Sequence, residues 1–228
     1  MEINIGIDPS INSTGIAWDI CDNDKTIHEE FYILKSDEQG KRHLTAREKK
    51  ADALDNFSYK FYDKLKQDSK DNIFNERHKS KNVRLLVKEI EGIICDIIYR
   101  EIWKYVPNDT IQINLNICQE AISYGSRIKT RSIFDLAGLN FVLRYMILDL
   151  FEMFKYRSDN ISPKILPPCY MVVPPSNIKK FISGNGNCNK ELMSELFLTT
   201  HAGFGVIPKV DDISDAWAMK EYVKANYK

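Results

Sequence analysis

The chain has 228 residues, enough for one well-buried domain but too few for two large ones, and no Pro/Ser/Gly-rich stretch marks a linker. Lys plus Arg and Asp plus Glu both number 32, so the formal net charge is zero, and any DNA-binding face must be local. The five cysteines are widely spaced and contain no Cys-x-x-Cys pair, which argues against a zinc site and a disulfide framework.

The chain begins directly with a strand-like pattern rather than an apolar signal segment. Its longest apolar stretch elsewhere is interrupted by Arg144, Asp149 and Glu152. We therefore expect a cytoplasmic protein with reduced thiols and no membrane span.

Three short β-like runs, separated by turn residues, open the chain at residues 2–8, 14–20 and 26–34. They predict a three-stranded antiparallel meander. In residues 41–71 the scattered apolar positions are spaced by three and four, which predicts an amphipathic helix. These positions are Leu54, Phe57, Phe61 and Leu65. Residues 72–82 are interpreted as a charged loop.

The second half of the chain alternates helical and strand-like patterns. An apolar stripe predicts a helix over residues 83–106, a strand follows at 111–119, and the most hydrophobic helix covers 132–154. A short strand is expected at 170–173. The last three helices are expected from residue 177, over 189–200 and over 211–224. Together these elements predict an α/β fold with a mixed sheet in a single domain.

Asp8 closes the first apolar strand and precedes a tight turn, Pro9-Ser10-Ile11-Asn12-Ser13. A carboxylate at the end of a buried strand needs a partner, and oxygen ligands of this kind suit Mg²⁺ or Mn²⁺. The same hairpin is typical of the phosphate-gripping turn of actin-like kinases. A third interpretation is that Asp8 only caps the turn.

Glu120 ends the fourth strand. Strand alternation predicts that Asn116, Cys118 and Glu120 point to one face of the sheet while Leu115, Ile117 and Gln119 point to the other. A single Glu at a strand end is usually only solvated, so Glu120 is a candidate site residue only together with the other acidic residues.

Asp212 and Asp215 are separated by one helical turn and project from the same helix face, where they can hold a cation between them. Asp211 competes with Asp212 as a ligand. Acidic residues in a first helical turn can also simply complement the helix dipole. The adjacent Ala216 and Ala218 favour a helix that lies close against the sheet, where uncompensated charges are costly.

Together these segments resemble the RuvC-type Holliday junction resolvases of the RNase H-like superfamily. The family's first-strand G-I-D-P-G-x-x-x-T-G motif corresponds to residues 6–15, its strand-end glutamate to Glu120, its glycine turn before a lysine to 178–190, and its D-x-x-D-A-x-A helix to 212–218. The matched segments cover about a third of the chain. Ser10 replaces the usual glycine, and residues 41–106 form a longer segment, interpreted as a helical insertion; viral and phage relatives vary most in such places.

The resemblance implies an RNase H-like five-stranded sheet, with three antiparallel strands and then two parallel ones, flanked by helices. It also implies a crossover junction endodeoxyribonuclease that resolves four-way DNA junctions in recombination and repair by paired nicks. Asp8, Glu120, Asp212 and Asp215 would hold two Mg²⁺ ions, with Mn²⁺ able to replace them, and Lys190 would stabilise charge on the scissile phosphate. In a viral member the enzyme would work in the host cytoplasm or the viral replication compartment.

Basic residues flank the candidate carboxylates and could neutralise DNA phosphates. Tyr124 could stack on a base opened at the branch point, or be a packing residue. The predicted DNA-binding residues are Tyr124, Arg127, Lys129, Arg131, Lys179, Lys180 and Lys190.

A four-way junction has near two-fold symmetry, which suggests a C2 homodimer. Helix 132–154 is the expected interface, so that Leu139→Glu or Leu143→Glu would give a soluble monomer.

Three other functions stay open. The same fold could cut RNA, flaps or other branches, because the catalytic set does not report sugar identity or branch geometry. An actin-like ATP-dependent phosphotransferase would need a second glycine-rich loop and a second domain, which the sequence lacks. A nuclease-derived DNA-binding scaffold without catalysis is disfavoured because all four carboxylates are present.

Overall fold

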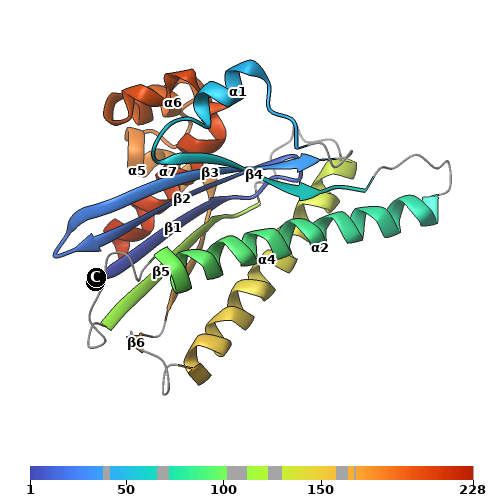
Figure 1. Cartoon of the computed structure of the whole chain (residues 1–228), viewed down its shortest axis with the longest axis horizontal. Coiled ribbons are helices and arrows are strands. Elements are labelled where there is room, and N and C mark those ends of the chain that lie inside the picture. The colour runs from blue at the N-terminus through green and yellow to red at the C-terminus, as the bar shows by residue number, and fades with distance from the viewer. Residues whose placement is uncertain are drawn as a thin grey trace.

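The computed structural model describes residues 1–37, 42–65, 72–101, 112–122, 130–157, 164–166 and 168–227. Within these ranges, the side chains of residues 72–74, 100–101, 130–134, 154–157 and 164–165 are not described. The architecture is the expected mixed α/β fold, in which one sheet of antiparallel and parallel strands is flanked by helices (Figure 1).

The sheet of the described residues has seven strands in the order β4-β3-β2-β1-β5-β6, with β7 also paired to β5. The strands are β1 (Glu2–Asp8), β2 (Ser13–Asp22), β3 (Lys25–Asp37), β4 (Phe57–Asp63), β5 (Gln112–Glu120), β6 (Lys164–Ile165) and β7 (Cys169–Val173). As expected, β1, β2 and β3 form an antiparallel meander, β5 pairs in parallel with β1, and β7 pairs in parallel with β5. The expected count of five strands is wrong, because β4 and β6 also pair with the sheet.

Seven α-helical or π-helical segments and one 3-10 segment complete the described part. They are α1 (Ala46–Ala51), α2 (Asn72–Asp96), the π-helix Ile97–Glu101, α4 (Thr130–Arg157), α5 (Pro175–Ser183), α6 (Lys190–Thr200), the 3-10 helix Ala202–Val206 and α7 (Val210–Asn226). In the described residues, no helix combines the length and the apolar character needed to cross a bilayer.

The amphipathic helix predicted for residues 41–71 is wrong at its centre. Within the described residues 42–65, only α1 is helical, and Thr45 and Glu48 cap its start reciprocally. Residues 57–63 form β4, parallel to β3, because the run is rich in aromatic residues and buries Phe57 and Tyr59 on one face. The spacing of Phe57 and Phe61 fits a helix and a strand equally well, so apolar spacing alone misassigned it.

The charged loop predicted at residues 72–82 is also wrong, because α2 begins at Asn72. Its first half carries few apolar residues and therefore lacks the stripe by which a helix is recognised. With β4 inside it, the segment 41–106 is not the purely helical insertion that we expected; residues 102–111 lie outside the described residues.

Helices α2 and α4 cover one face of the sheet, and α5, α6 and α7 cover the other (Figure 1). The first face holds the largest core cluster, in which Ile3, Ile5 and Ile7 of β1 pack with residues of α2 and α4. Leu139 and Leu143 are fully buried in this core. The expectation that they face a second subunit is therefore wrong, and a charge at either position would disrupt the fold itself.

The opposite side of α4 is apolar and exposed. Phe141 is 74% exposed, Tyr145 63% and Leu148 53%, and their spacing of four and three residues places them on one face of the helix. Val142, 37% exposed, borders them. We call these four residues the α4 stripe.

Candidate functional site

Two acidic residues end neighbouring parallel strands at the same edge of the sheet. Ile7 of β1 is in register with Gln119 of β5, and Asp8 and Glu120 are the next residues along each strand. Asn116 and Cys118 share the face of Glu120, as the alternation predicted, since Ile117 lies in the core on the other side. Asp8 and Glu120 therefore lie together on the side of the sheet that α7 covers.

Helix α7 lies in backbone contact with this face of the sheet. A Cβ atom on Gly15 would be 2.0 Å from the carbonyl oxygen of Asp212, and one on Gly6 would be 2.0 Å from that of Ala216. No other residue type fits these two positions without moving the helix. The close approach places the acidic first turns of α7 directly above Asp8, which is paired with Gly15 in the sheet.

A pocket of about 290 Å³ opens at this junction. Its polar wall consists of Asp8, Glu120, Asp215, Lys179 and Lys190, and its apolar wall of Pro175, Ile178, Met193 and Met219. Three of the four predicted carboxylates thus line one pocket.

The fourth carboxylate, Asp212, lies beside the pocket and accepts a hydrogen bond from the hydroxyl of Ser13. Its negative charge raises the pKa of Asp8. Asp211, the competing candidate, is paired instead with Lys190, at 3.1 Å. Of the two neighbours, Asp212 is therefore the one that acts on Asp8.

The site has an excess of negative charge. Burial is the largest cause that raises the pKa of Asp8 well above its usual value, and the charge of Glu120 comes next, ahead of those of Asp215 and Asp212. Burial, followed by the charge of Asp215, raises the pKa of Glu120 to about 7. A hydrogen bond between the Asp8 and Glu120 carboxyl groups partly offsets this rise, so the two titrate as a pair.

The helix-dipole interpretation of the α7 acids does not account for this arrangement. Asp211 and Asp212 lie in the first turn of α7, but Asp215 follows it, where the helix dipole is weak. Burial raises the pKa values of both Asp212 and Asp215. Their surroundings therefore disfavour the charged forms. A residue that only complemented the helix dipole would gain nothing from such burial, because the dipole stabilises the charged form.

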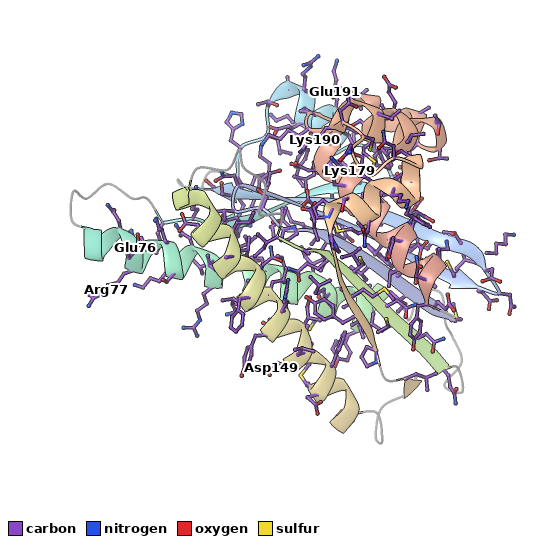
Figure 2. All side chains as sticks on the ribbon, turned by 180° about the vertical axis from the view of Figure 1, so that it is seen from behind. Glu76, Arg77, Asp149, Lys179, Lys190 and Glu191 are labelled. Atoms are coloured by element: carbon purple, nitrogen blue, oxygen red, sulfur yellow. The ribbon has the colours of Figure 1, made fainter. Side chains whose placement is uncertain are left out.

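Two lysines face the acids from α5 and α6, and Figure 2 shows both on this side of the molecule. Lys190, the first residue of α6, extends its ammonium to 3.9 Å from Asp215. Lys179 donates a hydrogen bond to the carbonyl oxygen of Cys188 at 2.9 Å, and so joins α5 to the turn before α6. Both lower the pKa of Asp215, although burial outweighs them.

The remaining predicted DNA contacts are only partly described. Lys180 is exposed on α5, where a phosphate could reach it. Tyr124, Arg127 and Lys129 lie outside the described residues, and so does the side chain of Arg131. The basic patch after Glu120 therefore stays a prediction.

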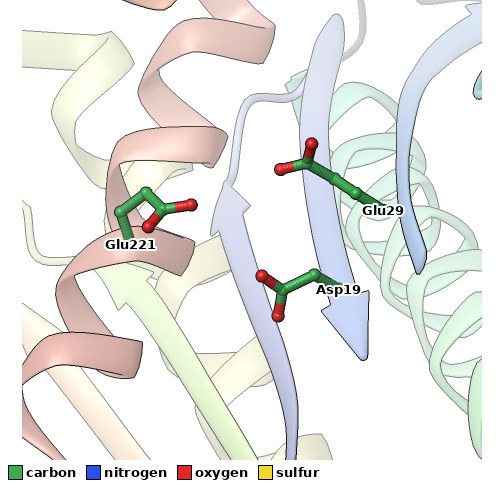
Figure 3. A group of neighbouring side chains, drawn as sticks. All are labelled: Asp19, Glu29 and Glu221. Atoms are coloured by element: carbon green, nitrogen blue, oxygen red, sulfur yellow. The ribbon is translucent and has the colours of Figure 1, made fainter. Parts of the chain in front are cut away.

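A second acidic group lies on the same face of the sheet. Carboxylate oxygens of Asp19, Glu29 and Glu221 come within 4.8 Å of one another, and Figure 3 shows the three side chains converging between the sheet and α7. Lys220 lies 3.4 Å from Asp19 and 2.8 Å from Glu221 and also pairs with Glu29, while Lys224 lies 3.0 Å from Asp19. Ammonium groups already neutralise this group, so it does not fit a metal ion.

The Asp8 group fits a divalent cation better, although its oxygens are less tightly clustered. Asp8, Glu120 and Asp215 share the pocket with Asp212 beside it, and the cations near them in the described residues are Lys190, Lys179 and Lys209. Burial and then neighbouring carboxylates raise the pKa values of these acids, and a bound cation would offset both effects. An all-oxygen donor set without histidine or cysteine matches Mg²⁺ or Mn²⁺ rather than zinc. Asp8, Glu120, Asp212 and Asp215 are the residues that would hold it.

Several residues of the site were missed from the sequence. Ser13 lies inside the turn motif, two residues before Gly15. A hydroxyl so close to the glycine that contacts α7 could have been identified as a hydrogen-bond donor to an acidic residue of that helix. Met193 and Met219 gave none, because a buried methionine in a helix is normally a core residue.

No protein-family model and no curated protein matches the chain. Among solved structures, RuvC of Thermus thermophilus is similar, with a TM-score of 0.41 and 12% identity over 96% of this chain and 90% of that one. The same enzyme in complex with a Holliday junction substrate gives 0.39 and 12% over 98% and 94%. The yeast mitochondrial Holliday junction resolvase Ydc2 gives 0.41 and 12% over 97% and 80%. These likenesses concern the fold, and the function has to be inferred from the side chains of this chain.

The raised pKa of Glu120 predicts how stability depends on pH. A carboxyl group whose pKa is raised on folding takes up protons as the chain folds, so stability falls as pH rises from 4.5, the ordinary value, to about 7. In EDTA, the Tm of the protein should fall across this interval. Glu120→Gln should flatten the fall and raise the free energy of unfolding near pH 8 by about 1–3 kcal/mol.

Glu30→Gln is the matched control. Hydrogen bonds with His28 and Tyr32 hold the pKa of Glu30 below its usual value despite its burial. Its replacement should therefore reduce stability near neutral pH. If Glu120→Gln were as destabilising as Glu30→Gln, the excess of negative charge in the pocket would be disproved.

Proposed function

We propose that this protein is a Mg²⁺-dependent, structure-selective endodeoxyribonuclease that resolves four-way DNA junctions in recombination and repair. The observation that carries the proposal is the gathering of Asp8, Glu120 and Asp215 around one pocket, with Asp212 beside it. These are the carboxylates of the motifs that resemble the resolvase family. The raised pKa values support a site whose charge is completed by a cation.

The four carboxylates would hold two Mg²⁺ ions, or Mn²⁺ in their place. Bound there, the ions would supply an activated water and stabilise the departing 3′ oxygen of the phosphodiester. Asp8, which the charges of the other three acids all reach, would hold the ions together with Glu120, Asp212 and Asp215. The hydroxyl of Ser13 would orient the Asp212 carboxylate through its hydrogen bond.

The lysines would act on the substrate phosphate. The side chain of Lys190 is 59% exposed, so its ammonium can leave Asp211 and move to a phosphate oxygen that enters the pocket. Lys179 would keep the turn before Lys190 in place through the carbonyl oxygen of Cys188. Lys180 would contact the DNA backbone beside the pocket, and each phosphate contact would make binding salt-dependent.

The α4 stripe is the proposed dimer interface. A junction with near two-fold symmetry calls for two sites related by a two-fold axis, and such an axis needs one self-complementary patch. Four of the large apolar side chains exposed in the described residues gather in eight residues of α4, on the face away from the core. A second copy that packs its own α4 against this face would cover them.

Cleavage of labelled substrates tests the function. With Mg²⁺, the protein should nick a four-way junction symmetrically and leave linear duplex uncut. Asp8→Asn should reduce the rate by at least about 100-fold, because loss of a metal ligand removes several kcal/mol of transition-state stabilisation. Asp212→Asn should be similarly impaired. Asp211→Asn is the control, and it should stay within about threefold of the wild type because Asp211 bonds only Lys190 in the site.

The alternatives predict other patterns. Equal cutting of flaps, junctions and RNA duplexes would assign a general branch nuclease or an RNase. Junction binding without any cutting would assign a scaffold that only binds DNA. ATP turnover without cutting would assign a phosphotransferase. Wild-type cutting by Asp8→Asn would contradict the proposed site.

Substitutions on α4 test the interface. Tyr145→Glu should convert the dimer into a folded monomer with weak junction binding, since it places a charge in the centre of the stripe. Leu139→Glu, on the buried face of the same helix, should instead lower Tm sharply by burying a charge. Light scattering and thermal unfolding separate the two effects. A dimer that persists in Tyr145→Glu would place the interface elsewhere.

A further inference from the structure

A polar row crosses the sheet beneath α7. Asn116 of β5, Asn4 of β1, Asp19 of β2 and Glu29 of β3 are in register from strand to strand. Asn116 donates a hydrogen bond to Asn4, and Asn4 donates one to Asp19, each at 2.9 Å. Asn116, Asn4 and Asp19 are completely buried, so a charge in this row must be neutralised inside the protein.

Lys220 of α7 supplies the positive charge that neutralises the acidic residues of the row. It is completely buried, and its ammonium contacts Asp19, Glu29 and Glu221. Burial alone would lower the pKa of Lys220, but the charges of these three carboxylates hold it above its usual value. Lys224, one turn further along, is partly exposed, and it bonds one carboxylate of the row, Asp19, together with Thr26 and Cys21. Lys220 is therefore the central cation of the row.

The row lies at one end of the α7 contact and the proposed metal site lies at the other. Asp19 and Gly15 are four residues apart on β2, roughly 13 Å along the strand. Lys220 follows Asp215 by five residues on the same helix, a rise of about 7.5 Å. Lys220 and the carboxylates of Asp212 and Asp215 are thus parts of one rigid element that bridges two acidic regions of the sheet.

The two ends of α7 experience opposite electrostatic forces. Asp215 shares a pocket with Asp8 and Glu120 and Asp212 lies beside it, so when these acids are ionised their like charges repel that part of the helix from the sheet. Lys220 faces Asp19 and Glu29, and opposite charges pull its end toward the sheet. Between these two parts of α7, Gly6 allows the helix to lie close to the sheet, because a glycine has no Cβ to collide with the backbone at Ala216 and Lys220.

We propose that Lys220 is a positioning residue for the proposed reaction: by binding Asp19 and Glu29 it fixes the register of α7 on the sheet, and so places Asp212 and Asp215 at the metal site. The inference rests on the proposed function, because it assigns Lys220 a part in assembling that site. Lys220 itself touches neither the pocket nor a reacting atom.

The test measures Mn²⁺ binding by calorimetry without DNA, and junction cleavage at saturating Mg²⁺ and DNA, both well below Tm. Lys220→Met should weaken Mn²⁺ binding by about 10–100-fold, the range for residues that orient ligands, and lower kcat with little change in junction KM. Lys220→Arg should restore both, because a guanidinium can pair with the same carboxylates. Lys224→Met should resemble the wild type in both measurements.

A purely structural Lys220 would lower Tm but leave the folded fraction fully active. If folded Lys220→Met binds Mn²⁺ and cuts junctions like the wild type, the positioning role is overturned and the proposed function stands. If the wild type neither binds Mn²⁺ nor cuts junctions, both fall. Should Lys220→Met not fold, Lys220→Met with Asp19→Asn removes the uncompensated charge, and wild-type Mn²⁺ affinity in that variant would equally overturn the inference.

Discussion

The backbone contact between α7 and the first two strands is the constraint on which the site depends. Gly6 and Gly15 have no Cβ atoms to keep the helix at a distance, so the carbonyl oxygens of Asp212 and Ala216 lie directly against the strands. The carboxylates of α7 are thereby placed close to Asp8 and Glu120 at the strand ends. Electrostatic repulsion between these acids would otherwise keep them apart. The helix core of Ile213, Ala216 and Met219 is buried, and that apolar contact holds the charges together.

The same face of the sheet carries acidic groups in two different states. At one end, Lys220 and Lys224 pair with the acidic residues Asp19, Glu29 and Glu221. The hydrogen bond with His201 and the charge of Lys220 hold the pKa of Glu29 at about 2, against its burial. At the other end, burial first and the charge of Asp215 second raise the pKa of Glu120 to about 7. Close clustering of oxygens therefore does not identify the metal site, since the tighter group already holds lysine. The group with unbalanced charge is the functional candidate, and such imbalance is typical of active sites.

Much of this could be predicted from the sequence because strand ends and helix turns have fixed geometry. Alternation along β5 predicted which face Glu120 occupies, and the spacing of Asp212 and Asp215 predicted a shared helix face. Other features could not be predicted. The apolar spacing in β4 fits both a helix and a strand, and the solvated start of α2 shows no apolar periodicity at all. Which face of α4 is buried depends on its packing against α2. Lys220 also gave no signal, because its role depends on strand register across β1, β2 and β3.

Crystals soaked in Mn²⁺ would test the central claim directly, since anomalous scattering locates the ion without reference to activity. The account predicts anomalous density in the pocket between Asp8, Glu120 and Asp215, and none among Asp19, Glu29 and Glu221. Density only at the second group, or at neither, would contradict the assignment of the metal site and with it the proposed hydrolysis.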